Sequence, residues 1–243
     1  MARLLPLSAR TRVAFAGVLA ALVLVHDVPT TVTANDRAYA RRILEAAGHA
    51  GDAAAYGDLA NFENQIQAVL AVQDAVLKAT PKSEGLPLGQ PREPQDLFVA
   101  GKGLCFDRSR VIEKLLAHLG LEQRHLSVFS TKDGSSKLTA LLGDTTKSHA
   151  LTEVRTSKGW MLVDSNARWI GLDANRQPVA AGALHDASVA GGPWAADSTA
   201  PINRIFAGEF TYLIGLYSRH GGFYWPYTPV PDYNLWQLAQ NVW

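Results

Sequence analysis

The sequence predicts an α+β fold in which one helix packs on an antiparallel sheet. An apolar stripe with helical spacing begins after Cys105 and ends at Gly120, a residue suited to a helix C-terminus. Three short segments rich in β-forming residues follow, at 124–130, 149–156 and 160–164. Turn-forming residues separate them, which is typical of antiparallel strands. The chain of 243 residues is long enough for one well-packed domain.

The residues before this helix predict two more helices and a connecting loop. Between residues 35 and 79, apolar residues recur every three to four positions, as in helices that bury one face. Residues 81–94 contain four prolines and two glycines, which indicate a loop. We therefore assign residues 35–90 to an N-terminal helical segment with its linker, and residues 91–170 to the core.

The segment after the core, residues 171–243, is predicted to pack on it as an extension. Residues 171–200 are rich in Ala, Gly and Asp and are predicted to form a loop. Residues 202–243 carry many aromatic side chains. Because aromatic rings dominate burial, we expect these rings to pack on the core. A carbohydrate or partner surface is the alternative, and a position beside the cleft would satisfy both. The aromatic residues are Phe206, Phe210, Tyr212, Tyr217, Phe223, Tyr224, Trp225, Tyr227, Tyr233, Trp236 and Trp243.

The N-terminus is typical of an export signal. Three arginines, Arg3, Arg10 and Arg12, precede an uncharged run at residues 13–25. This run is shorter than the roughly 20 residues that span a bilayer, which favours a cleaved signal peptide over residues 1–34. An uncleaved membrane anchor through the same run is the alternative. The protein is thus expected to be periplasmic or extracellular, or anchored to the inner membrane.

Composition and charge exclude several classes of partner. The net charge is +1, and Lys and Arg are scattered, so no stripe of positive charge is available for nucleic acid. The sequence contains no Cys/His cluster of the zinc-binding kind and no alternating Asp and Asn run of the calcium-binding kind. We expect no cofactor and no metal.

The single cysteine is the first candidate for chemistry. An exported protein with one cysteine carries a free thiol, because no internal disulfide can form. Cys105 lies at the predicted start of a helix, where the helix dipole favours an anion. The backbone N–H groups of the same turn could also stabilise an oxyanion. A buried structural cysteine would gain nothing from this position.

A nucleophile of this kind needs a base and a group that orients the base. His149 begins one predicted strand and Asp164 ends the next. Pairing of the strands around residues 158–159 would place Asp164 opposite residue 153, four residues from His149. A tighter pairing would place the two directly opposite. Both registers keep the side chains on one face of the hairpin, and the sequence does not choose between them.

These residues resemble the motifs of the transglutaminase-like superfamily. The resemblance lies in Gly103-Leu104-Cys105, a following helix, His149 on a strand, Gly159-Trp160 and Asp164, and it covers about residues 92–169. It implies a papain-like core and amide-bond chemistry through a thioester. Two departures concern the shape of the cleft: Leu151 replaces a common aromatic residue, and Ser165-Asn166 replaces a common Pro or Thr.

The expected function is a thiol-dependent amide or peptide hydrolase, or an acyltransferase, with Cys105 as nucleophile, His149 as base and Asp164 as orienting group. A protein or peptide substrate is expected, and hydrolysis is favoured over crosslinking. The alternative is a non-catalytic binding module in cell-envelope or polysaccharide assembly. An arylamine-type acetyltransferase fits poorly with export.

Three further residues are interpreted as structural or supporting. His118 and His125 lie outside the triad and are interpreted as structural. Arg108 follows Cys105 within the same helix, where it could anchor the active-site loop or a substrate carboxylate.

Overall fold

A computed structural model of the chain describes residues 26–87, 90–131, 136–142, 146–189, 202–217 and 232–242. The apolar run at residues 13–25, the turn at 132–134 and the aromatic residues Phe223, Tyr224, Trp225, Tyr227 and Trp243 lie outside these ranges.

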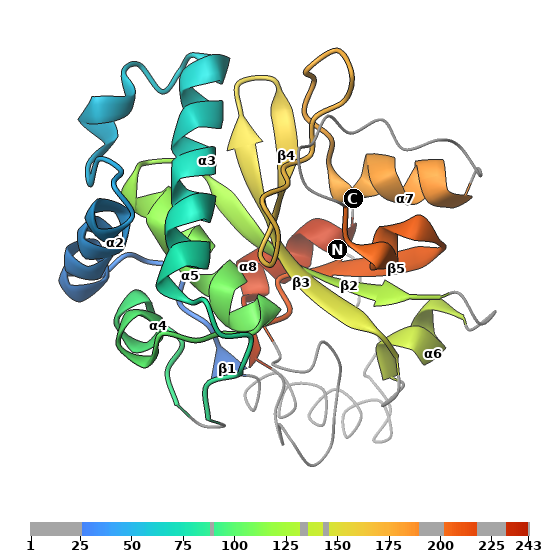
Figure 1. The fold of residues 1–243 in the computed structure, drawn as a ribbon. Coiled ribbons are helices and arrows are strands. Elements are labelled where there is room, and N and C mark those ends of the chain that lie inside the picture. Colours follow the sequence, from blue (N-terminus) through green and yellow to red (C-terminus); the bar gives the residue numbers. More distant parts are fainter. Residues whose placement is uncertain are drawn as a thin grey trace, which may run out of the picture.

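A four-stranded antiparallel sheet forms the centre of the fold (Figure 1). Its strand order is β4-β3-β2-β5. The strands are β2 (Gln123–Ser130), β3 (Ser148–Thr156), β4 (Gly159–Asp164) and β5 (Phe210–Ile214). The three strands predicted from the sequence are therefore present, and the α+β fold class is confirmed.

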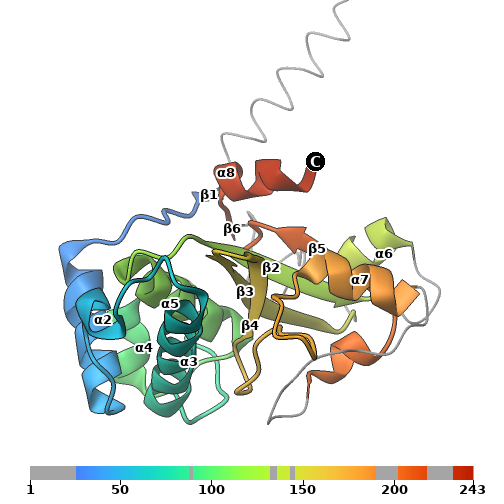
Figure 2. The same ribbon diagram turned by 90° about the horizontal axis from the view of Figure 1, so that it is seen from above.

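Helices cover one face of this sheet (Figures 1 and 2). They are α2 (Ala34–Ala46), α3 (Phe62–Ala79), α4 (Pro94–Ala100) and α5 (Cys105–His118), with a short 3-10 helix η1 (Ala53–Tyr56) before α3. Their buried apolar residues form one cluster with Val154, Met161 and Val163 of the sheet. The cluster places α5 between the sheet and the outer helices.

The other face of the sheet has its own core. Leu126, Val128, Leu151 and Leu162 pack there against α7 (Ala181–Val189) and η2 (Arg204–Ala207). The prediction of a loop throughout residues 171–200 is therefore wrong for α7. Its low charge and high Ala and Gly content resembled a loop, but Ala181 and Leu184 gain burial against the sheet.

The C-terminal segment contributes a strand to the sheet. β5 pairs with β2 from Ser130↔Phe210 to Leu126↔Ile214. The segment predicted as an extension therefore supplies part of the central sheet. Phe206, Phe210 and Tyr217 are buried, as expected for aromatic residues that pack on the core, whereas Trp236 is 81% exposed. The helix α6 (Lys137–Leu142) follows β2 and was not predicted.

The two ends of the described chain meet in a small second sheet. β1 (His26–Asp27) pairs in parallel with β6 (Asp232–Tyr233), and α8 (Leu235–Leu238) and η3 (Ala239–Val242) follow β6. None of the described helices is both long and apolar enough to cross a membrane.

Candidate active site

Helix α5 places Cys105 at its first residue. Its apolar stripe, predicted from the sequence, is buried against the other helices and the sheet. The carboxylate of Asp107 accepts a hydrogen bond from the Leu104 backbone N–H at 2.9 Å, which caps the helix N-terminus. The helix ends near Gly120, whose φ of +84° suits glycine. Cys105 is a free cysteine of intermediate exposure, so the first residue of this buried helix is itself partly exposed.

The hairpin of β3 and β4 has a register that lies between the two predicted ones. Thr156 pairs with Gly159 across a two-residue loop, and Asp164 consequently pairs with Leu151. Both predicted registers are wrong by two residues, because the loop consists of Ser157 and Lys158. The shift is even, so His149 and Asp164 remain on one face as diagonal neighbours.

His149 and Asp164 form a direct polar contact. The Nε2 atom of His149 lies 3.0 Å from Oδ2 of Asp164. Both side chains are buried, with exposed fractions of 3% and 0%. Since Nε2 faces Asp164, Nδ1 is the ring nitrogen left for the sulfur, and His149 also interacts with the side chain of Cys105. The structure therefore brings the three predicted residues together.

The pKa of His149 is strongly raised by this environment. Burial alone would lower its pKa, but the charge and the hydrogen bond of Asp164 outweigh burial, and the Cys105 side chain adds to them. Together they raise the pKa of His149 from 6.5 to about 10. An imidazolium is thus favoured beside the sulfur at neutral pH.

Asp164 is stabilised as a carboxylate. Its Oδ1 atom accepts backbone N–H bonds from Asn166 at 2.7 Å and from Ala167 at 2.9 Å. Burial by itself would raise its pKa, yet the charge and hydrogen bond of His149 and these backbone donors lower the pKa below 3.8. Oδ1 of Asp164 therefore binds the loop backbone, and Oδ2 contacts His149.

Gln73 holds the backbone that carries Asp164, a role the sequence analysis missed. Its Nε2 atom donates to the carbonyl oxygens of Asp164 at 2.8 Å and of Trp169 at 2.7 Å. Gln73 lies on α3 and is 1% exposed. A polar residue amid a buried helical stripe was the available signal, because a buried amide requires partners.

Arg108 links α5 to two loops beside the candidate site. It donates to the backbone oxygen of Thr80 at 2.8 Å and to Oδ1 of Asn166 at 2.7 Å. Burial lowers the pKa of Arg108, and the charges of Cys105 and Asp164 counteract this in part. Of the two roles considered from the sequence, these bonds correspond to anchoring of the loop after Asp164.

A second polar cluster lies on α5 behind Cys105. Nδ1 of His125 lies 2.6 Å from Oε1 of Glu113 and 3.2 Å from Oγ of Ser109. Tyr217 donates its hydroxyl to Oε2 of Glu113 at 2.6 Å and stacks on the His125 ring at 4.2 Å between centroids. His125, Ser109 and Glu113 are at most 1% exposed.

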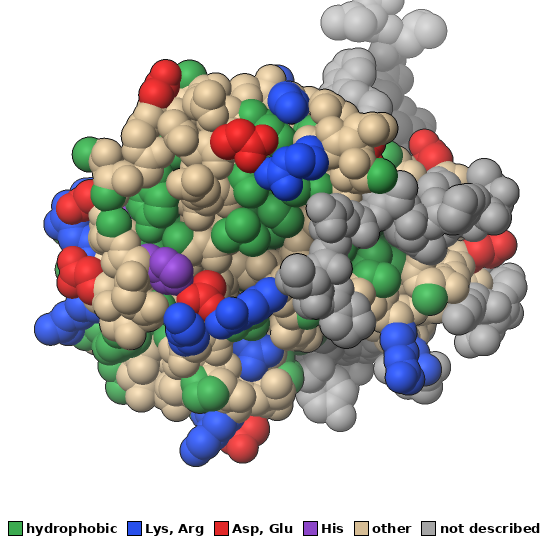
Figure 3. All heavy atoms as spheres, turned by 45° about the horizontal axis from the view of Figure 1, so that its top comes forward, with side chains coloured by type: hydrophobic (Ala, Val, Ile, Leu, Met, Phe, Trp, Pro, Cys, Tyr) green, Lys and Arg blue, Asp and Glu red, His purple; other side chains and the backbone are tan. Residues whose placement is uncertain are grey.

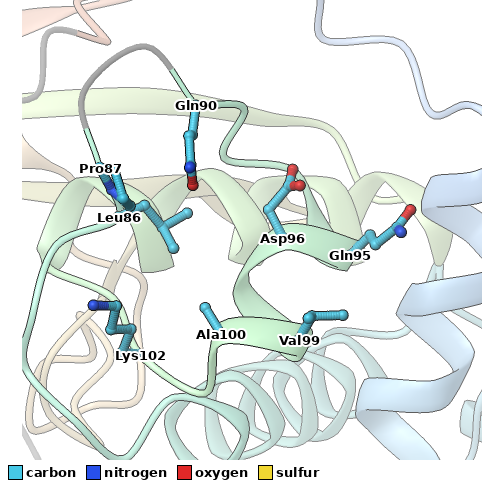
Figure 4. A pocket seen from close by; sticks show the side chains of 8 residues that line it. All are labelled: Leu86, Pro87, Gln90, Gln95, Asp96, Val99, Ala100 and Lys102. Atoms are coloured by element: carbon cyan, nitrogen blue, oxygen red, sulfur yellow. The ribbon is translucent and has the colours of Figure 1, made fainter.

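Two pockets lie near the elements that carry the site. One of about 360 Å³ separates α4 from the preceding loop and is lined by Leu86, Val99 and Lys102 among others (Figure 4). Another of about 640 Å³ includes Gln73 and Arg168. Within the described part of the chain, no group of three or more His, Cys, Asp or Glu side chains could hold a metal ion.

A family model matches the part of the chain that contains the candidate site. The family model of the transglutaminase-like superfamily matches residues 53–165. This part of the chain is a transglutaminase-like domain. No curated protein and no solved structure matches the chain.

The transglutaminase-like match begins well before the predicted core. It includes α3, whereas we had placed the start of the core at residue 91. The packing of α3 on α5 and the two bonds from Gln73 explain why a core of this kind needs that helix.

The residues that depart from the superfamily pattern have their own contacts. Ser165 donates its hydroxyl to the backbone oxygen of Ala150 at 2.6 Å, and Asn166 accepts the bond from Arg108. Leu151 is fully buried in the core on the α7 side of the sheet. The loop after Asp164 is therefore held by hydrogen bonds to β3 and α5.

Proposed function

We propose that the protein is a cysteine amide hydrolase in which Cys105 is the nucleophile, His149 transfers protons and Asp164 orients His149. The observation that carries the proposal is the contact chain from the partly exposed Cys105 side chain to His149 and on to Asp164. A nucleophile, a base and an orienting group in this order are what covalent catalysis requires.

The raised pKa of His149 supports a positively charged imidazole beside the sulfur. This charge and the N-terminal end of α5 both favour negative charge at the position of the sulfur. The site is therefore suited to a sulfur nucleophile.

In the proposed reaction, the Cys105 thiolate attacks an amide carbonyl carbon and forms a C–S bond. The oxyanion that results lies near the backbone N–H groups of the first turn of α5. His149 gives its proton to the leaving amine as the C–N bond breaks, which leaves a thioester. His149 then takes a proton from water, and the resulting hydroxide attacks the thioester, releases the acid and restores the thiolate.

Water is proposed as the acceptor in preference to an amine, and a protein or peptide as the substrate. The Asp164 loop is closed by bonds to Gln73, Arg108 and β3.

An assay on casein with a fluorescent primary amine separates the alternatives. We expect new peptide N-termini and little incorporation of the fluorescent amine, with both signals lost in the Cys105→Ala protein. Incorporation of the amine in place of cleavage would reassign the acceptor. Cleavage by Cys105→Ala at the wild-type rate would overturn the mechanism. Intact mass measurement after an electrophilic peptide probe tests the nucleophile independently, because the adduct must lie on Cys105.

A further inference from the structure

The residues that follow the apolar run are built into the fold. Val28 donates its backbone N–H to the Tyr233 oxygen at 2.7 Å, and its own oxygen accepts from Nδ2 of Asn234 at 2.9 Å. Val28 is 7% exposed. The segment from residue 26 onward is therefore part of the folded domain.

The same segment satisfies two buried cations of α5. Arg110 donates to the backbone oxygen of Pro29 at 2.7 Å, and Lys114 donates to that of Thr31. Both basic side chains are 3% exposed. Thr33 caps α2 by accepting from the Asp36 backbone N–H at 3.1 Å. Cleavage after Ala34 would remove all of these acceptors. Arg110 would keep Glu93, and Lys114 would keep Asp36 and Glu93, but each buried cation would lose a backbone hydrogen bond, which is destabilising.

The exposed surface of α8 lies beside this segment. Trp236 is 81% exposed and Leu235 is 44% exposed, and both are large apolar side chains. In Figure 2, α8 lies next to β1 and β6 at one end of the molecule. Tryptophan with one apolar and one polar edge is enriched where proteins meet the bilayer interface.

The distance from the apolar run to Trp236 is short. Val25 directly precedes β1, whose Asp27 is paired with Tyr233. Paired strands are about 5 Å apart and each residue extends the chain by at most about 3.6 Å, so Trp236 lies within about 23 Å of the end of the run.

We propose that residues 13–25 are retained as a membrane anchor and that the α8 surface, Leu235 and Trp236, rests on the outer surface of the bilayer. Arg3, Arg10 and Arg12 favour a cytoplasmic start of the chain, which places the folded domain on the opposite side. The partner of this surface is the lipid interface.

A retained run of this length would hold the residues that flank it close to the bilayer surface. Thirteen residues in a helix span about 20 Å, less than the hydrocarbon core of about 30 Å. A short run thins the bilayer and draws its flanking residues into the headgroup layer. Here the flanking residues are those of β1, and β1 carries β6 and α8 with it because the strands are paired.

Two measurements on the full chain test the proposal. The first is the intact mass of protein expressed in an exporting bacterium. We expect a mass that includes residues 13–25, and a mature chain that begins at residue 26 or at residue 35 would each overturn the anchor.

The second measurement places an environment-sensitive fluorophore at position 236. Full-length Cys105→Ser protein carrying Trp236→Cys is labelled and reconstituted in vesicles of phosphatidylethanolamine and phosphatidylglycerol with brominated acyl chains. The matched control carries Val99→Cys, since Val99 is 72% exposed on α4, away from α8 (Figures 1 and 2). We expect brominated lipid to quench the probe at position 236 severalfold more than at 99. Equal quenching at the two positions would contradict contact between α8 and lipid.

Discussion

Two pairs of a histidine and a carboxylate with both side chains buried lie beside α5, and their differences separate a reactive site from a structural one. His149 and Asp164 are 3.0 Å apart, and His125 and Glu113 are 2.6 Å apart. Both pairs are buried, so neither distance nor burial distinguishes them.

The two pairs differ in the third residue and in which nitrogen of the histidine ring this residue contacts. At His149, one ring nitrogen faces Asp164 and the other is left for Cys105, which is partly exposed. At His125, both Ser109 and Glu113 contact the same Nδ1 atom, so the ring cannot pass a proton between them by way of its two nitrogens. Ser109 is also fully buried. A hydroxyl, an imidazole and a carboxylate in contact are therefore not sufficient for catalysis.

The largest difference between the two sites is expected when the side chain that contacts each histidine, Cys105 or Ser109, is replaced by alanine. Cys105→Ala should abolish amide hydrolysis, because no other group can form the thioester. Ser109→Ala should retain activity within a few-fold and lose about 1 kcal/mol of unfolding free energy with its buried hydrogen bonds. Steady-state kinetics and urea denaturation measure the two quantities. An active Cys105→Ala protein, or an inactive but stable Ser109→Ala protein, would reverse the assignment of the two clusters.

Removing the charge of Asp164 or of Glu113 should separate the two sites in the same way. Asp164→Asn is expected to lower kcat by about 10²- to 10⁴-fold, since it removes the charge that holds the His149 proton. Glu113→Gln should change kcat little but lower stability by about 1–3 kcal/mol, because Tyr217 and His125 lose a charged acceptor. Similar kcat losses in both variants would show that the two pairs act as one unit.

Gln73 provides a finer test, since it acts on Asp164 through the backbone. Gln73→Leu is expected to lower kcat by about 10- to 100-fold through misplacement of the loop. The matched control is Gln65→Leu on the same helix, whose oxygen accepts from the Ser157 backbone N–H at the far end of the hairpin. Both variants should be destabilised, and only Gln73→Leu should also lose activity. Equal activities of the Gln73→Leu and Gln65→Leu proteins would show that Gln73 does not position the loop that carries Asp164.

The last prediction concerns the pH dependence of stability. The raised pKa of His149 stabilises the fold fully below 6.5, and this contribution is lost as the pH rises toward about 10. The lowered pKa of Asp164 acts in the opposite direction, since its contribution is present above 3.8 and is lost as the pH falls through the folded value.

The difference in unfolding free energy between wild type and Asp164→Asn should therefore be largest between pH 3.8 and 6.5. We expect about 3 kcal/mol there and a smaller difference at pH 10, measured by urea denaturation. A difference that does not vary with pH would contradict the ionic pairing of His149 and Asp164.

The sequence predicted the parts of the site that depend on local pattern. The stripe of α5, Gly120 and the turn before Trp160 each follow a local rule, so Cys105, His149 and Asp164 could be placed on their elements. The prediction that His149 and Asp164 lie on one face of the hairpin was correct although the predicted registers were not. Side chains alternate between the two faces of a strand, so a shift of two residues leaves each side chain on its face.

The parts that the sequence did not predict depend on distant contacts. β5 pairs with β2 across 80 to 88 residues, and Gln73 reaches Asp164 across 91. No local pattern encodes such pairings. Arg110 and Lys114 on α5 are buried because residues 26–33 and the loop before α4 supply acceptors.

The most direct test of the proposed site is the pH dependence of Cys105 alkylation by iodoacetamide, compared between wild type and His149→Gln. If His149 holds the sulfur as an anion, wild type should react rapidly well below the pKa of about 8.5 of an ordinary thiol. The His149→Gln protein should follow that ordinary value. Identical profiles centred near 8.5 for both proteins would contradict activation of Cys105 by His149 and would favour a binding module with a vestigial site.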